Sequence, residues 1–248
     1  MGMLIVNADD FGYCPAVNKG VIESYQQGIV TSATIMVGMP GFDQAIELAK
    51  ANPGMGLGVH LTLTCRKPIR NDVPSLVDEH GDFHKITFYE KDFSVDLDEV
   101  YQEWKAQINK VIASGIQPDH LDSHHHVHTI KGITQVFDQL AKEYQLPVRG
   151  NYSKSKGIKS PAYFFTNFDS VARTKDIWKP YDIHNLIENT NKFGSVEIMC
   201  HPGYLDTTIY EGSSLNINRM YTMRELQNKH YPKLLQENGV TLGTFKDL

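Results

Sequence analysis

The sequence has few cysteines and no long apolar run, and each absence excludes a class of protein. Its three cysteines, Cys14, Cys65 and Cys200, are an odd number without a CxxC spacing. That usage excludes a disulfide framework and a cysteine-rich zinc site, and we expect three reduced thiols. The longest apolar stretches, 4–6 and 33–37, fall far short of the roughly 20 residues that cross a bilayer. No membrane partner is therefore expected.

Basic clusters and nucleotide-binding motifs are also missing. The net charge is −5 and no run of Lys or Arg is longer than a dipeptide, so a nucleic-acid partner is not expected. Neither GxGxxG nor GxxxxGK[ST] occurs, which leaves dinucleotide and P-loop binding without a basis. The first residues lack a basic segment followed by a long apolar one, so we expect no signal peptide and a cytoplasmic protein.

One residue type is concentrated in one place. Five of the 11 histidines, namely those at 120, 124, 125, 126 and 128, fall within nine residues. The 41% hydrophobic and 21% charged fractions of the 248 residues are otherwise typical of one globular domain, which we take as 1–248. The histidine cluster therefore calls for a chemical explanation.

Short β-branched runs alternate with amphipathic stretches along the whole chain, a pattern that indicates parallel strands joined by helices. The predicted strands are 4–7, 32–37, 56–61, 120–123, 146–149, 196–200 and 241–245. The predicted helices are 15–27, 42–51, 95–114, 130–144, 183–191 and 223–238. About seven such units predict an α/β fold, a distorted or incomplete (β/α) TIM-like barrel with about seven parallel strands. An open doubly wound sheet is the alternative.

Ionisable residues follow several of the predicted strands. The carboxyl ends of parallel barrel strands share one face, where active sites are built. Five strands therefore deliver such groups to one place: Asp9, Asp10, His60, His124, Arg149 and His201. The long irregular segments 64–94 and 151–182 are typical of lids or binding loops.

The adjacent carboxylates Asp9 and Asp10 have two interpretations. Side chains alternate along a strand, so one could ligate a metal ion while the other acts as a base. Alternatively, one of them caps the helix that begins at Pro15. Their place at the end of an apolar strand favours the metal-site interpretation.

The histidine cluster indicates a metal site. Imidazole is the commonest ligand for transition metals, and mixed His and carboxylate sites suit several divalent ions. In an extended 120–124 segment, His120, Asp122 and His124 share one face, and His124 is the last of them. His125, His126 and His128 cannot all reach the same ion, so we expect them to support the site, contact the substrate or pack.

The roles of four further residues remain open at this point. His60 is a packed histidine or a metal ligand, and Arg149 pairs with a buried carboxylate or orients a catalytic aspartate. His201 precedes Pro202 at a strand end and is a candidate general acid, with Glu197 as its support.

Four segments in the same order resemble the YdjC-like carbohydrate deacetylases, a family that includes the chito-oligosaccharide deacetylases. These are Asn-Ala-Asp-Asp-Phe-Gly at 7–12, Gly-Val-His-Leu-Thr-Leu-Thr at 58–64, the histidine-rich 120–128, and Glu-Ile-Met-Cys-His-Pro-Gly at 197–203. The resemblance covers essentially the whole chain.

The resemblance implies a distorted barrel, one divalent metal ion (Mg²⁺ or Zn²⁺) and often a homodimer. The implied reaction removes N-acetyl groups from amino sugars, namely chito-oligosaccharides or a related, sometimes phosphorylated, disaccharide, as in chitin degradation. It makes Asp10, His60 and His124 the metal ligands, Asp9 the catalytic base and His201 the acid.

Other residues are expected at the substrate or behind the ligands: Arg149, His125, Glu197 and Tyr204. The aromatics of the long loops stack on sugar rings or cover the barrel mouth: Tyr163, Phe164, Phe165, Trp178 and Tyr204. Two other reactions remain alternatives, hydrolysis of a sugar phosphate and of a glycosidic bond. Adjacent carboxylates suit the second poorly, because a glycosidase places one on each side of the bond.

Overall fold

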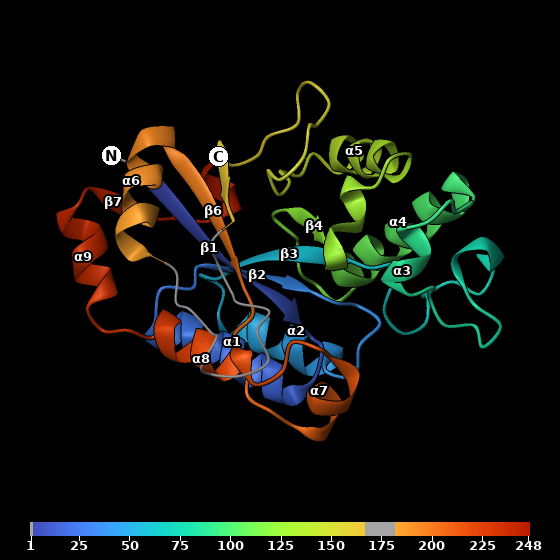
Figure 1. Ribbon diagram of the computed structural model, residues 1–248, viewed down its shortest axis with the longest axis horizontal. Coiled ribbons are helices and arrows are strands. Elements are labelled where there is room, and N and C mark those ends of the chain that lie inside the picture. The colour runs from blue at the N-terminus through green and yellow to red at the C-terminus, as the bar shows by residue number, and fades with distance from the viewer. Residues whose placement is uncertain (1, 167–181) are drawn as a thin grey trace.

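The computed structural model describes residues 2–166 and 182–248, and it builds one curled parallel sheet with helices outside it (Figure 1). The strands are β1 (Gly2–Phe11), β2 (Ser32–Ile35), β3 (Gly56–Leu61), β4 (Leu121–Ser123), β5 (Tyr163–Phe165), β6 (Ser195–Cys200) and β7 (Val240–Leu242). The helices are α1 (Pro15–Gln27), α2 (Phe42–Ala51), α3 (Ile86–Tyr89), α4 (Leu97–Ala113), α5 (Ile133–Glu143), α6 (Ile183–Phe193), α7 (Thr207–Gly212), α8 (Asn218–Leu226) and α9 (Tyr231–Glu237).

The sheet confirms the incomplete barrel. Its order is β4-β3-β2-β1-β6-β5, with β7 added to β1, and these strands all pair in parallel. Parallel strands need crossover connections, and helices supply them in this chain. β4 and β5 are the two ends of this order and do not pair with each other among the described residues, so the barrel does not close through them. All carboxyl ends of the strands lie on one rim.

Strand β1 is the centre of the sheet because three strands pair with it. Its first residues pair with β7, residues 3–8 pair with β6, and its second half pairs with β2. Between Ala8 and Phe11 the register with β2 shifts by one residue, which is a β-bulge. The bulge contains Asp9 and Asp10, and Asp10 has a φ of 64°.

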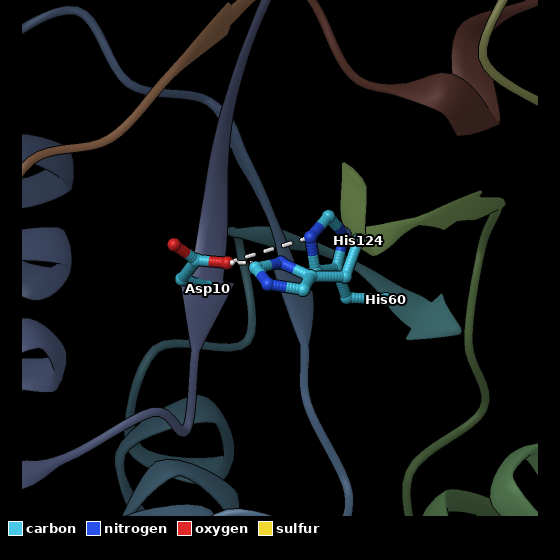
Figure 2. A group of neighbouring side chains, drawn as sticks. All are labelled: Asp10, His60 and His124. Atoms are coloured by element: carbon cyan, nitrogen blue, oxygen red, sulfur yellow. Dashed lines mark ion pairs between the residues drawn. The ribbon is translucent and has the colours of Figure 1, made fainter. Parts of the chain in front are cut away.

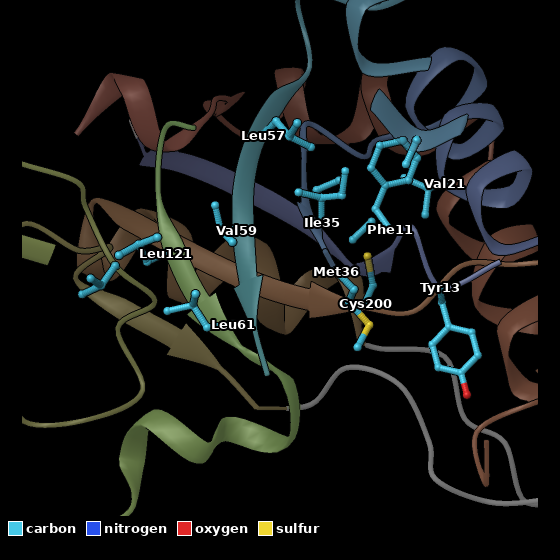
Figure 3. Close-up of a cluster of buried hydrophobic side chains, with 14 of the residues drawn as sticks. Phe11, Tyr13, Val21, Ile35, Met36, Leu57, Val59, Leu61, Leu121 and Cys200 are labelled. Atoms are coloured by element: carbon cyan, nitrogen blue, oxygen red, sulfur yellow. The ribbon is translucent and has the colours of Figure 1, made fainter. Parts of the chain in front are cut away.

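The core lies between the sheet and its helices. Phe11 at the end of β1, Ile35 on β2 and Val21 on α1 pack together, and all three are fully buried (Figure 3). Val59 and Leu121 lie further along the sheet in the same cluster. Burying each such side chain stabilises the fold by about 1.5–3 kcal/mol. The strand ends that form the rim are therefore supported by a packed apolar core.

Three predicted elements differ from the structure. The strand expected at 146–149 makes a single parallel bridge between Leu121 and Val148, and β5 lies in a segment expected to be irregular. The helix expected at 223–238 is two helices, α8 and α9. Pro232 causes the break, because its ring would clash with the carbonyl group of Asn228 in a continuous helix.

None of the described helices is long and apolar enough to cross a membrane. Trp178, expected among the sugar-stacking aromatics, lies outside the described residues.

Candidate metal centre and active site

Three side chains from three strand ends converge at the rim of the sheet. Asp10 comes from β1, His60 from β3, and His124 directly follows β4 (Figure 2). Asp10 Oδ1 lies 3.1 Å from His124 Nδ1 and 3.5 Å from His60 Nε2. One ligand atom from each residue falls within 4.8 Å of the others, which is close enough to share one metal ion.

The β-bulge explains how both neighbouring aspartates reach this point. Regular alternation would send Asp9 and Asp10 to opposite faces of the sheet. The extra residue of the bulge re-aims one of them, and Asp10 takes the left-handed conformation that Asp tolerates better than most residues. As a result, Asp9 Oδ2 also lies 3.9 Å from His60 Nε2.

A second carboxylate orients His60 from behind. His60 Nδ1 lies 2.7 Å from Asp122 Oδ1, and Asp122 also accepts a hydrogen bond from the Thr34 hydroxyl at 3.1 Å. The ionised carboxylate must accept from His60 Nδ1–H, which leaves the lone pair of Nε2 facing Asp9 and Asp10. This is the arrangement that fixes a histidine as a metal ligand.

Arg149 is the centre of a buried charge network. Its guanidinium group donates to Asp9 at 2.6 and 2.8 Å, a bidentate contact. It also lies 2.8 Å from Asp122 Oδ2 and donates to Glu197 Oε1 at 2.8 Å. Both interpretations of Arg149 therefore hold geometrically, because it pairs with buried carboxylates and orients Asp9.

A second buried arginine comes from the far end of the chain. Arg219 on α8 donates from Nη2 to Asp10 Oδ2 at 2.6 Å, and from Nε to the carbonyl oxygen of Leu215 at 2.8 Å. Sequence reasoning missed Arg219, since α8 has no motif and no strand precedes it. Its contact occupies one oxygen of Asp10 and leaves the other facing the two histidines.

The residues fit a divalent cation. Asp10 Oδ1 is buried without a hydrogen-bond partner, which is costly unless something positive binds it. Four buried carboxyl groups, of Asp9, Asp10, Asp122 and Glu197, face two buried guanidinium groups, of Arg149 and Arg219. In a second possible group of ligands, Asp9, His60 and Asp122, the Arg149 guanidinium already bridges the two carboxylates.

The same charges shift the pKa values of the site. Burial alone would raise the pKa of Asp9 and Asp10. Arg149 together with His60 lowers the pKa of Asp9, and Arg219 together with His124 and His60 lowers that of Asp10, so both lie below the usual range. Burial would lower the pKa of His60, yet Asp122 and Asp9 raise it to about 10. The negative charge of the cluster therefore favours a bound cation. When no metal ion is bound, a proton on His60 supplies that positive charge.

The remaining histidines of the cluster diverge from His124. His125 and His126 both have left-handed backbones, with φ of 54° and 53°. His125 Nδ1 lies 2.9 Å from Thr64 Oγ1, whereas His126 Nδ1 lies 3.2 Å from Asn151 Nδ2. Burial lowers the pKa of both to about 3, so both are neutral at pH 7.

His120 is buried below the rim and packs rather than joining the metal cluster. Its Nδ1 lies 2.6 Å from Asp119 Oδ1, and its ring stacks on Phe245 with centroids 3.7 Å apart. Gly58 makes room for it, because a Cβ at that position would lie 2.5 Å from the imidazole.

The other predicted site residues divide into two groups. His201 directly follows β6, at the same rim. Tyr204 is turned away: its hydroxyl donates to Glu23 on α1 at 2.5 Å, and Lys19 lies over its ring. The structure thus does not bring Tyr204 to the cluster.

Two cavities flank the histidines. The first, about 720 Å³, is lined by His124 and His125 together with the charged residues Arg66, Asp82, Lys85 and Glu211. The second, about 710 Å³, is lined by His126, Gly150, Asn151, Tyr152, Ala162, Tyr163, Phe164 and Thr166. Phe165 is buried in the core, so of the three aromatics of β5 only Tyr163 and Phe164 line a cavity.

Comparison with known proteins gives consistent relatives. Residues 3–237 match the family model described as YdjC-like protein. A carbohydrate deacetylase from Clostridium beijerinckii is 38% identical, with 99% of each chain covered, and one from Enterococcus faecalis is 40% identical, covering 99% of this chain and 97% of the other.

Solved structures agree in fold. A crystal structure from Enterococcus faecalis V583, of a protein to which cellobiose-phosphate cleavage has been attributed, has a TM-score of 0.86 at 36% identity. It covers 99% of this chain and 98% of that one. A CE4 esterase from Streptococcus mutans has a TM-score of 0.53 at 11% identity, covering 98% and 85% of the two chains, and so shares the fold alone.

Proposed function

The chain belongs to the YdjC-like family, and from that premise we propose that it is a metal-dependent carbohydrate deacetylase that hydrolyses N-acetyl groups of amino sugars. The observation that carries the proposal is the buried Asp10 Oδ1, which has no hydrogen-bond partner and faces His60 and His124 beside a second buried carboxylate, Asp9. A binding protein would not need that second carboxylate. Relatives named carbohydrate deacetylase, 38% and 40% identical, supply the substrate class.

Asp10, His60 and His124 would hold the ion, Mg²⁺ or Zn²⁺. When bound, a divalent ion polarises the acetyl carbonyl and lowers the pKa of water, as an amide substrate requires. Three protein ligands leave coordination positions free for substrate, which distinguishes a catalytic site from a structural one. Asp122 keeps the His60 proton on Nδ1 and thus the lone pair on Nε2.

Asp9 acts as the base. Arg149 holds it ionised and in one orientation. Asp9 Oδ1 also accepts from Asn7 Nδ2 at 3.0 Å, whereas Oδ2 keeps a lone pair beyond its guanidinium contact. Asp9 Oδ2 faces the Nε2 side of His60, so it can take a proton from water that attacks the acetyl carbon. His201, at the same rim, protonates the departing sugar nitrogen. Glu197 and Arg149 position Asp9, and His125 lines the substrate cavity.

The preferred substrates are chito-oligosaccharides. A phosphorylated disaccharide is the second candidate, because Arg66 and Lys85 line the larger cavity. Asp82 and Glu211 line it too, however, so the charges balance and a neutral sugar is favoured. The protein is further proposed to act in the cytoplasm as a homodimer.

Cleavage of a glycosidic or phosphoester bond is the competing reaction, and the attribution made for the Enterococcus faecalis relative favours it. The carboxylates argue against it. Glycosidases place two carboxyl groups across a bond, whereas Asp9 and Glu197 are joined here through a single guanidinium group.

One assay separates these reactions. The metal-loaded protein is given N-acetylglucosamine oligomers and a phosphorylated disaccharide, and acetate, reducing ends and inorganic phosphate are measured with and without chelator. We expect acetate alone, abolished by the chelator and restored by added metal. New reducing ends or phosphate without acetate would contradict the proposal, and acetate release that resists the chelator would contradict the metal.

A further inference from the structure

The three consecutive histidines at 124–126 face three different surroundings, whereas in a regular strand the first and the third would share one face. Two successive left-handed residues make this possible. His124 faces the metal ligands, His125 lines the charged cavity, and His126 lines the second cavity. Left-handed backbone in two non-glycine residues costs free energy, which points to a use for the separation.

A chain of hydrogen bonds behind His126 fixes its proton. The Ser123 hydroxyl lies 2.5 Å from His128 Nδ1 and also accepts from the His128 backbone N–H. His128 Nε2 lies 2.8 Å from Asn151 Oδ1, so this nitrogen carries the proton and donates. The Asn151 amide in turn donates to His126 Nδ1. His126 therefore keeps its proton on Nε2.

The cavity lined by His126 has the composition of a site for an uncharged, amphipathic ligand. None of the described residues that line it is Asp, Glu, Lys or Arg, unlike the first cavity. It combines the aromatic ring of Phe164 with the side-chain polar groups of Asn151 and His126. Binding sites of this kind pair apolar surface with a few placed donors and acceptors.

The cavity is also connected to the catalytic carboxylate. The guanidinium group of Arg149, which binds Asp9, lies over the Phe164 ring at 5.5 Å from its centroid. The Phe164 ring in turn meets the His126 ring edge-on at 6.1 Å. A ligand in this cavity thus lies two side chains from Asp9.

We propose that this cavity is a sugar subsite, in which a second, uncharged pyranose ring of the substrate packs on Phe164 and accepts a hydrogen bond from His126 Nε2–H. His126 is then a specificity-determining residue, and Asn151 and His128 are positioning residues that keep its tautomer. The inference rests on the proposed function for the identity of the substrate. It assigns a role to the part of the histidine cluster that holds no metal.

The test measures how activity depends on sugar length. We expect His126→Ala and Asn151→Ala to lower kcat/KM for N,N′-diacetylchitobiose about tenfold through KM, with less than a twofold change for N-acetylglucosamine. His80→Ala, which removes a histidine whose side chain is 76% exposed, is the matched control and should change neither. An equal loss on both substrates, or no loss on the disaccharide, overturns the subsite.

Binding without turnover separates this inference from the proposed function. N,N′-diacetylchitobiose is titrated into metal-loaded Asp9→Asn protein and into the Asp9→Asn, His126→Ala double variant. About tenfold weaker binding in the double variant supports the subsite even if no deacetylation is ever detected. Equal affinity of the two overturns it, and so does absence of binding to both.

The tautomer relay has its own readout. Nitrogen-15 NMR should show His126 Nδ1 as an unprotonated acceptor in the wild-type protein and a mixture of tautomers in Asn151→Ala. A His126 ring protonated on Nδ1 in the wild-type protein would contradict the relay.

Discussion

Two buried aspartate–histidine pairs lie one above the other inside the sheet and have different surroundings. His60 lies 2.7 Å from Asp122 at the rim, and His120 lies 2.6 Å from Asp119 below it. The free nitrogen of His60 faces two further carboxylates, whereas that of His120 is buried without a partner and its ring stacks on Phe245. A paired histidine is thus not a metal site by itself, because a site also needs further carboxylates and an opening to a cavity.

The strongest test of this contrast exchanges each carboxylate for its amide. Asp9→Asn should lower acetate release roughly a thousandfold, the usual scale for losing a general base, while metal content measured by mass spectrometry stays the same. Asp119→Asn should leave the rate within a few-fold and reduce stability instead. An unchanged rate in Asp9→Asn, or a thousandfold lower rate in Asp119→Asn, would contradict the roles assigned to the two buried aspartate–histidine pairs.

A smaller effect is expected on metal affinity. His124→Ala removes one of three protein ligands and should weaken metal binding by about a hundredfold or more, since even residues behind the ligands contribute 10- to 100-fold. His120→Ala, a matched removal of an imidazole, should bind metal as the wild type does. Titration with a competing chelator measures both. Equal metal affinity in the two variants would mean that the ion binds elsewhere.

The smallest expected effect is that of pH on the stability of the metal-free protein. The direction of this effect differs between two buried histidines, His128 and His60. Burial lowers the pKa of His128 to about 4, so the unfolded chain binds more protons and stability should fall by about 1 kcal/mol per pH unit below 6.5. His60, with its pKa raised to about 10, contributes stability that is present at low pH and lost as pH rises through 10.

Urea unfolding of the chelator-treated protein at pH 7 and pH 5 measures the His128 contribution. The difference between the two pH values should shrink in His128→Gln and persist in His80→Gln, whose histidine is exposed in the wild type. An unchanged difference in His128→Gln would contradict the buried, neutral imidazole.

Much of the fold was predictable because strands and helices alternate with clear periodicity. The strands around Leu4, Val59 and Ile198 lie where apolar runs are densest, and the structure confirms them. β5 was not predictable, since Tyr163–Phe165 is three residues long inside an irregular segment. The helix predicted at 223–238 is interrupted because of Pro232, and hydrophobic periodicity alone does not take proline into account.

The site was predictable in part, for a physical reason. Strand ends predict which side chains share a rim, and Asp10, His60 and His124 do meet there. The alternation of side chains along a strand predicted that Asp9 and Asp10 point to opposite faces. The β-bulge brings both to His60, and no pattern in the sequence predicts that bulge. Their roles stay predictions until the experiments above are done.

Residues whose position depends on long-range contacts could not be found from the sequence. Arg219 reaches Asp10 only because α8 packs beside α1, and Asn151 meets His126 and His128 only through the fold. Tyr204 was predicted at the substrate as an aromatic residue that stacks on sugar rings, yet its hydroxyl donates to Glu23.

The Asp10–Arg219 pair can form only late in the synthesis of the chain. Asp10 precedes Arg219 by 209 residues in the chain, so Asp10 is synthesised well before its partner. A nascent chain that has already made β1 through β6 still lacks the guanidinium group that compensates its buried carboxylate. The centre is therefore completed only after α8 has been made, and a truncation before α8 would keep β1 to β6, remove β7 and leave the buried Asp10 carboxylate without its guanidinium partner.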